Sequence, residues 1–242
     1  MNIRILLGLF FICSTVAFGQ MSAAQNQKNI SRYSKEPSDS KRAIRRYIPH
    51  TNSIQRAHKA GTRDKTGTPG PNYWQLKTDF DIDARLDPAT QTITGSETIT
   101  LHNTSPDELK KIVLRLDHNL FRPRVPRGFS VPAETTEGMV LTKITVNGEV
   151  IDLKAKPPKG FFGNQNATPE RSFAVGLTQT VAQVFLAKPI TAKSVGKIKI
   201  EWRTKLPGGK GGQGHRMTQR WDSRVFQPTQ WFPRLAKYDD LR

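Results

Sequence analysis

The sequence predicts an all-β fold, an antiparallel β-sandwich, and three observations lead to this prediction. From Leu76 to Leu86, apolar residues or threonine occupy the even positions and charged residues the odd ones. This period of two is typical of a strand with one buried and one solvated face. Asn147-Gly148 separates two further alternating runs, and this dipeptide is the strongest short-range signal for a β-hairpin. No convincing amphipathic helix interrupts the short strands, which favours a sandwich.

The β-sandwich domain is placed at residues 71–205, which is long enough to bury a core. Turn chemistry at Asp87–Thr90 ends the first strand, and Gly95 is expected to mark a bulge or a close approach of another chain segment. The predicted strands cover residues 76–86, 93–101, 112–116, 140–146, 150–153, 181–186 and 197–203.

Residues 1–19 are typical of a signal peptide. Arg4 precedes an apolar run from Ile5 to Phe18, and small residues stand before an expected cleavage site near Gly19-Gln20. A secreted or periplasmic protein is therefore expected. The single cysteine, Cys13, lies inside this signal, so the cleaved protein would have neither a disulfide nor a thiolate ligand.

Residues 20–70 are predicted to be a disordered basic linker. They hold 11 Lys and Arg against 3 Asp and Glu, within a chain whose net charge is +18. Apolar residues there are isolated, which leaves only a weak possible helix at 41–47. Residues 28–65 could contact an anionic surface, although a solvated linker is the favoured interpretation. The scarcity of aromatic residues argues against specific nucleic-acid binding.

Residues 206–219 are predicted to form a Gly-rich loop. Gly209, Gly211 and Gly214 formally match a dinucleotide-binding pattern. That mechanism requires a parallel βαβ unit and a following helix, and the surrounding sequence predicts neither. A flexible loop is the favoured interpretation.

The sequence contains no convincing catalytic or metal-binding motif. None of the five histidines is followed by Glu, so the H-E-x-x-H zinc motif is absent. His118 beside Asp117 is the most site-like histidine, but a partly exposed residue at a strand end is the favoured interpretation. Solvation explains why Asp79, Asp81 and Asp83 share one strand face, and a loose calcium site is the alternative.

Three pieces of the chain carry a family resemblance: Pro69–Gln75, Asp87–Asn103 continuing through Ser105–Asn119, and Gln230–Asp240. Over residues 69–242 the chain resembles the N-terminal domain of aminopeptidase N-like zinc metallopeptidases (peptidase family M-one, gluzincins), and it is most similar to the bacterial secreted branch. The resemblance implies a saddle-like β-sandwich. In the family a thermolysin-like domain follows, with H-E-x-x-H, a Glu ligand and a Gly-x-Met-Glu-Asn loop. None of these motifs is present here, so no cofactor is expected in this chain and zinc only in the catalytic domain.

The resemblance implies that residues 220–242 start the lead-in to a missing catalytic domain. The chain is expected to be truncated, to serve as scaffold and substrate-cleft wall, and not to hydrolyse peptides alone. Family members often place an acidic or amide residue near this point to hold the substrate's free amine. Phe232 falls roughly at that place, and Gln230 is the nearest candidate contact. Trp231, Phe232 and Arg234 are expected to pack between domains.

The expected partners are a catalytic domain in cis and a peptide substrate. If a partner domain is missing, the surface around five residues should be unusually apolar; these are Trp221, Val225, Phe226, Trp231 and Phe232. The alternative function is a standalone secreted binding module that attaches to anionic surfaces through its basic leader.

Overall fold

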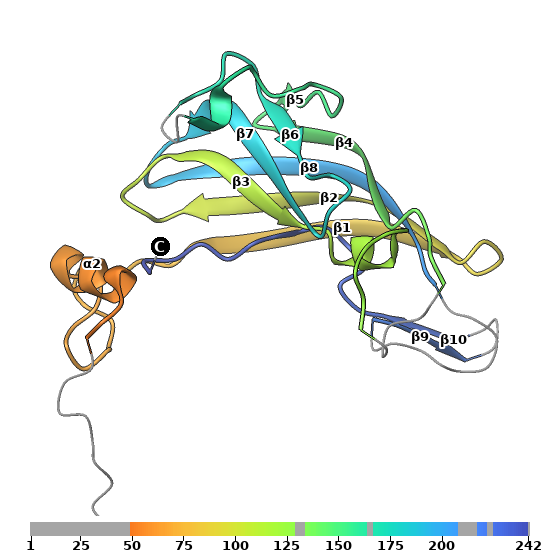
Figure 1. Cartoon of the computed structure of the whole chain (residues 1–242), viewed down its shortest axis with the longest axis horizontal. Coiled ribbons are helices and arrows are strands. Elements are labelled where there is room, and N and C mark those ends of the chain that lie inside the picture. The colour runs from red at the N-terminus through yellow and green to blue at the C-terminus, as the bar shows by residue number, and fades with distance from the viewer. Residues whose placement is uncertain (1–48, 129–133, 164–166, 208–216, 222–224, 242) are drawn as a thin grey trace, which may run out of the picture. The chain divides into compact units, whose positions relative to one another are not determined.

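The computed structural model describes residues 49–128, 134–163, 167–207, 217–221 and 225–241. Every helix and strand named below belongs to the compact unit Thr51–Arg242 (Figure 1). The predicted signal peptide, the possible helix at 41–47 and residues 208–216 of the predicted Gly-rich loop lie outside the described residues. Among the helices in the described ranges, none is long and apolar enough to cross a membrane.

Two antiparallel sheets form the body of the fold (Figure 1). The larger has the order β1-β2-β8-β4-β5, with β1 (Lys77–Asp87), β2 (Thr92–Asn103), β4 (Met139–Val146), β5 (Glu149–Val150) and β8 (Ser194–Lys205). The smaller has the order β11-β3-β7-β6, with β3 (Leu109–Arg115), β6 (Phe173–Val175), β7 (Val181–Ile190) and β11 (Arg234–Leu235). The remaining elements are β9 (Thr218–Trp221) and β10 (Val225–Pro228), which form a ribbon, and the helices α2 (Asn52–Ala60), η1 (Asp117–Phe121) and η2 (Phe161–Gly163).

The core is formed by the side chains on one face of each sheet. β8 shows this alternation most clearly, because its residues are exposed and buried in turn without interruption from Val195 to Lys205. Fully buried residues from both sheets meet in one cluster, among them Ile99, Ile144, Ile198, Ile200, Leu114, Leu186 and Ile190. The prediction of an all-β antiparallel sandwich is therefore confirmed.

β1 departs from its predicted burial. The sequence indicates one buried face, yet none of the residues of β1 is buried and Phe80 is 39% exposed. β1 is an edge strand that pairs only with β2, so part of its apolar face lies beyond the cover of the second sheet.

The predicted hairpin at Asn147-Gly148 is confirmed. Asn147 has φ 49° and Gly148 has φ 87°, and positive φ at both central residues matches a type I′ turn. The strand after it is shorter than the predicted 150–153, since β5 covers only two residues and Val150 is 62% exposed.

Gly95 marks a close approach and not a bulge, because β2 pairs with β1 and β8 without a register shift. A Cβ added at Gly95 would lie 2.8 Å from Cζ2 of Trp202 and 2.9 Å from the carbonyl oxygen of Asp83. The buried indole of Trp202 thus occupies the space that a side chain at position 95 would need.

Gly95→Ala is therefore expected to lower the free energy of unfolding by about 2 kcal/mol, the usual cost of overpacking a core. Urea denaturation followed by tryptophan fluorescence measures the change. Ser96→Ala, on the opposite face of β2, serves as the matched control and should stay close to the wild type. Equal stability of the Gly95 variant and the control would contradict the assigned close approach.

Helix α2 corrects part of the linker prediction. It lies inside the segment 20–70, for which composition predicts disorder, and it ends at Gly61 in the left-handed region with φ 70°. Ala57 is buried, and Arg63 donates two hydrogen bonds to the carboxylate of Asp240, of 2.9 and 3.0 Å. Local composition cannot reveal a partner that is 177 positions away in the chain.

Candidate functional site

The stretch with the most specific family resemblance forms one continuous segment, residues 229–241, here called the strap. It follows β10, pairs with β3 through Arg234 and Leu235, and makes a bridge between Asp239 and Gln75. Figure 1 shows it returning toward α2. The strap is thus an integral part of the sandwich and connects its two ends.

At the α2 end, the strap is held by a ring contact and an ion pair. The rings of Tyr238 and Trp74 lie 5.1 Å apart, and the carboxylate of Asp240 accepts from Arg63. This hydrogen bond lowers the pKa of Asp240. Arg63 is one of the basic residues counted for a possible anionic-surface contact, and in the structure its guanidinium group is paired with Asp240 of the strap.

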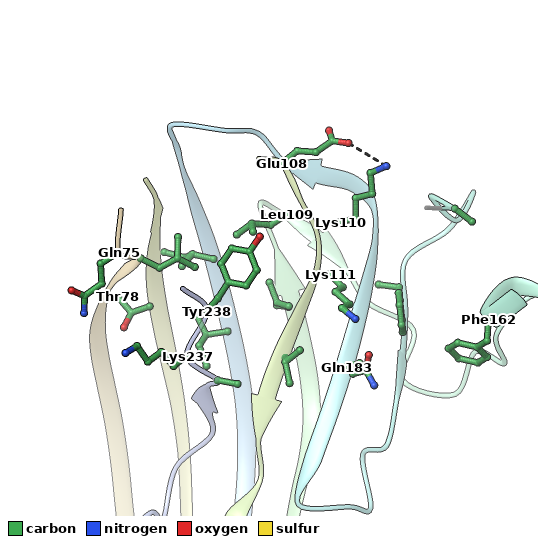
Figure 2. A pocket seen from close by; sticks show the side chains of 18 of the residues that line it. Gln75, Thr78, Glu108, Leu109, Lys110, Lys111, Phe162, Gln183, Lys237 and Tyr238 are labelled. Carbon is green, nitrogen blue, oxygen red and sulfur yellow. Dashed lines mark ion pairs between the residues drawn. The ribbon is translucent and has the colours of Figure 1, made fainter. Parts of the chain in front are cut away.

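Between these contacts and β3, a groove of about 1000 Å³ opens (Figure 2). Leu109 and Lys111 of β3, Gln183 of β7 and Tyr238 of the strap all line it. The groove exists because the strap pairs with β3 only near Leu114 and then continues toward Gln75. Sequence periodicity contains no signal for such a gap.

At the other end, η1 supplies two buried polar anchors. His118 is fully buried, and its Nε2 donates to the carbonyl oxygen of Thr229 over 2.9 Å. Burial lowers the pKa of His118, which favours the neutral ring. Because a carbonyl can only accept, Nε2 carries the proton and Nδ1 is left without a partner. The expectation of a partly exposed His118 was therefore wrong.

Asp117 bridges β3 and the strap. Its two carboxylate oxygens accept hydrogen bonds from Arg115 and Arg234, each over 2.6 Å. Burial alone would raise the pKa of Asp117, but these hydrogen bonds outweigh burial and the pKa is lowered. Asp117 is therefore ionised at neutral pH and holds both arginines.

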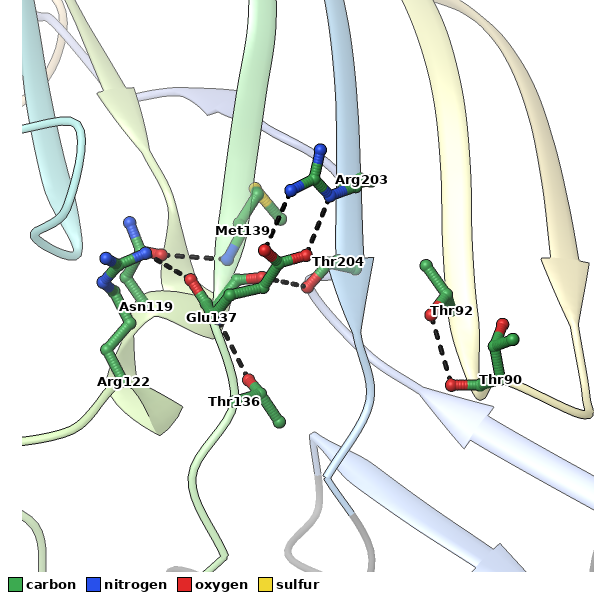
Figure 3. A network of polar contacts seen from close by, with 10 residues as sticks. Thr90, Thr92, Asn119, Arg122, Thr136, Glu137, Met139, Arg203 and Thr204 are labelled. Carbon is green, nitrogen blue, oxygen red and sulfur yellow. Dashed lines mark hydrogen bonds and ion pairs between the residues drawn. The ribbon is translucent and has the colours of Figure 1, made fainter.

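A polar network fixes η1 and hence both anchors (Figure 3). Asn119 Oδ1 accepts from the backbone N–H of Met139 over 2.9 Å. Glu137 accepts two hydrogen bonds from Arg203, of 2.8 and 2.9 Å, and its carbonyl oxygen accepts from Arg122. The network therefore links η1, which carries both anchors, to β4 and β8.

The aromatic residues of the strap pack within this domain. Trp231 lies 5.6 Å from Trp202 and 5.1 Å from Phe232, and Phe232 lies 5.8 Å from Phe80, measured between ring centroids. Trp231, Phe232 and Phe226 are partly buried against the core. Their predicted interdomain role, with that of Arg234, stays a prediction.

The expected apolar surface is smaller than predicted among the described side chains. Val225 is 53% exposed, whereas Phe226, Trp231 and Phe232 are half-buried. The side chain of Trp221 lies outside the described set. Trp231 and Phe232 are partly covered because they pack against Trp202 and Phe80 of the larger sheet.

Gln230 stands between two fixed neighbours. The carbonyl of Thr229 is held by His118, and Trp231 packs on Trp202. Gln230 itself has φ 55° and is half-buried. A left-handed conformation is uncommon for a non-glycine residue. In the described part of the chain, no hydrogen bond engages its side-chain amide.

Glu97 is a buried polar residue that the sequence analysis missed. It is 3% exposed and both carboxyl oxygens lack a hydrogen-bond partner, as does the indole N–H of Trp202. Burial raises the pKa of Glu97 to about 8. The sequence did contain a sign of this burial. Glu97 is the one charged residue among the alternate positions Ile93, Gly95, Ile99 and Leu101, which share the inward face of the strand.

Within the described ranges, no group of three or more His, Cys, Asp or Glu side chains could hold a metal ion. The alternative of a calcium site on β1 receives no geometric support. Asp79 instead contacts Nε2 of His102 at 2.8 Å and Nζ of Lys77 at 3.2 Å. These contacts lower the pKa of Asp79, the His102 hydrogen bond most.

Comparison with known proteins gives the following findings. No protein-family model matches the chain, and no curated protein matches it. Similar solved structures include a two-domain M1 zinc metallopeptidase bound to L-arginine, with 15% identity and a TM-score of 0.36 over 64% of this chain and 27% of that chain. Another is an M1 zinc metallopeptidase from Deinococcus radiodurans bound to a Tyr-Ser-Ala substrate, with 15% identity and a TM-score of 0.34 over 63% and 26%. The chain spans about a quarter of the length of these structures.

Proposed function

We propose that this chain is the non-catalytic N-terminal β-domain of a secreted zinc aminopeptidase-like protein. It acts as a scaffold and as one wall of the substrate cleft, in cis with a zinc-peptidase domain. The sequence resemblance of Gln230–Asp240 supports the family. The observation that supports the role is the geometry of Gln230, which stands between two fixed neighbours and whose amide has no hydrogen bond within the described residues.

In this proposal Gln230 binds the free amine of a peptide. The amide oxygen of Gln230 accepts a hydrogen bond from the substrate's α-ammonium group. A neutral acceptor fits this task without the cost of burying a second charge. The anchors at His118 and Trp202 keep the amide in place, so the peptide's first residue is positioned relative to the partner domain. The strap thus provides recognition, and the partner domain provides the zinc and the hydrolytic chemistry.

The test uses a protein that carries this chain in front of a zinc-peptidase domain. Gln230→Ala is expected to raise KM for an aminoacyl anilide about tenfold with little change in kcat, because a hydrogen bond to a charged group contributes about 1.5 kcal/mol. Gln227→Ala, exposed on β10, is the matched control and should leave KM unchanged.

The 242-residue chain assayed alone is expected to show neither turnover nor stoichiometric zinc. Turnover with bound zinc by this chain would overturn the non-catalytic role. Unchanged kinetics of Gln230→Ala in the joined protein would overturn the amine contact while leaving the scaffold role in place.

A further inference from the structure

The groove beside the strap has an apolar part and a cationic part (Figure 2). The apolar part lies between β3 and the strap and is lined by Leu76, Leu109 and Tyr238. Leu109 is buried, and the other two are half-buried against the core. This part can shield an aliphatic chain from water.

The cationic part lies on the outer face of β3 and β7. Lys111 is paired with Phe185, and Val113 with Gln183, in the antiparallel register. Lys111 and Gln183 are therefore diagonal neighbours on one face, close enough for both side chains to reach one small group between them. The ammonium group of Lys111 lies 5.9 Å from the ring centroid of Phe185.

The charge of the groove favours an anion. Among the described residues that line the groove, Glu108 is the only one with a carboxylate, and Glu108 is paired with Lys110 at 3.4 Å. Lys237, also at the groove, is paired with Asp239 at 3.5 Å. In the described part of the chain, Lys111 has no carboxylate partner, so its charge is available to a ligand.

We propose that the groove binds a long-chain carboxylate. The carboxylate lies between Nζ of Lys111 and the side-chain amide of Gln183, and the alkyl chain enters the apolar part between β3 and the strap. The walls combine apolar side chains with placed polar groups, as small-molecule sites do, and the volume of about 1000 Å³ lies in the range of such sites. The proposal goes beyond the proposed peptidase role and does not depend on it.

Calorimetric titration of the full chain with dodecanoate, kept below its micelle concentration, tests the proposal. We expect saturable binding of one dodecanoate per chain. Dodecanol, which keeps the chain and lacks the charge, is expected to bind about tenfold more weakly, and acetate, which lacks the chain, is expected not to bind. Absence of saturable dodecanoate binding, or equal binding of dodecanol, would overturn the proposal.

Two variants localise the site. Lys111→Gln is expected to weaken dodecanoate binding about tenfold, and Thr78→Phe is expected to weaken binding by narrowing the groove that Thr78 lines. Lys199→Gln, an exposed lysine on β8, is the matched control and should bind like the wild type. Urea denaturation shows whether each variant is folded. If Thr78→Phe is not folded, the result for Lys111→Gln, an exposed position, is the test of the assignment. Equal affinity of Lys111→Gln and the control would place binding elsewhere and overturn the assignment.

Discussion

Replacing Glu97 with methionine is expected to stabilise the protein increasingly as pH rises. The pKa of Glu97 is raised from 4.5 in the unfolded chain to about 8 in the folded protein. At about 1.4 kcal/mol per pH unit, the advantage of the methionine variant should grow by about 4 kcal/mol between pH 4.5 and pH 8. Methionine has a similar length and needs no hydrogen-bond partner.

The sign of this effect follows from the protonated carboxyl. Well below pH 4.5 both folded and unfolded states hold the proton, and Glu97 causes no pH-dependent loss of stability there. As pH rises toward 8, the unfolded state releases the proton while the folded state retains it, so stability falls. His118 acts oppositely, because its lowered pKa makes stability fall as pH drops below 6.5. His118 is present in both proteins, so its contribution cancels in the difference.

Urea unfolding of the wild type and Glu97→Met across this pH range measures the effect. Glu201→Met is the matched control, since Glu201 lies on the exposed face of the neighbouring strand. If the unfolding free energies of the wild type and Glu97→Met run parallel with pH, Glu97 is not a buried, unpaired acid.

Replacing Asp117 with alanine is expected to detach the strap from β3 and cost about 3 kcal/mol of unfolding free energy. The substitution leaves Arg115 and Arg234 without their shared carboxylate. The side chain of Asp117 is 8% exposed, so water cannot replace it easily. The expected loss of unfolding free energy lies at the lower end of the range for breaking buried ion pairs, because both arginines are partly exposed.

Two measurements separate strap release from general destabilisation. Urea denaturation gives the total change in stability, and Asp81→Ala, on the exposed face of β1, is the control. Hydrogen exchange at the amide of Ala236, which donates to the carbonyl of Val113 over 2.8 Å, reports on the strap itself. We expect Asp117→Ala to accelerate exchange, relative to the wild type, at Ala236 but much less at the amides of β8. Uniform acceleration across both sheets would show that Asp117 stabilises the whole fold and not the strap in particular.

Much of the β-sandwich could be predicted from local patterns. The Leu76–Leu86 alternation, the Asn147-Gly148 turn and the alternation in β8 all depend on residues a few positions apart. Gly95 was likewise recognisable as a special position. Even so, the pattern overstated the burial of β1, because alternation identifies a face and not what covers it.

The short strands and the candidate site could not be predicted in the same way. β6 and β11 have too few residues for a period to be visible, and they form because β7 and β3 present open edges to them. Helix α2 and its loop depend on Asp240. The burial of His118 depends on Thr229, 111 positions away.

By itself the sequence determined the fold class and the principal turns. Local alternation and turn chemistry act over a few residues, so they can be read directly from the chain. Only the tertiary structure decided that Gln230–Asp240 pairs with β3 as part of the same sandwich. It also decided that Glu97 is buried without a hydrogen-bond partner and that a groove opens beside Lys111. Those features arise from contacts between distant residues, which no local pattern records.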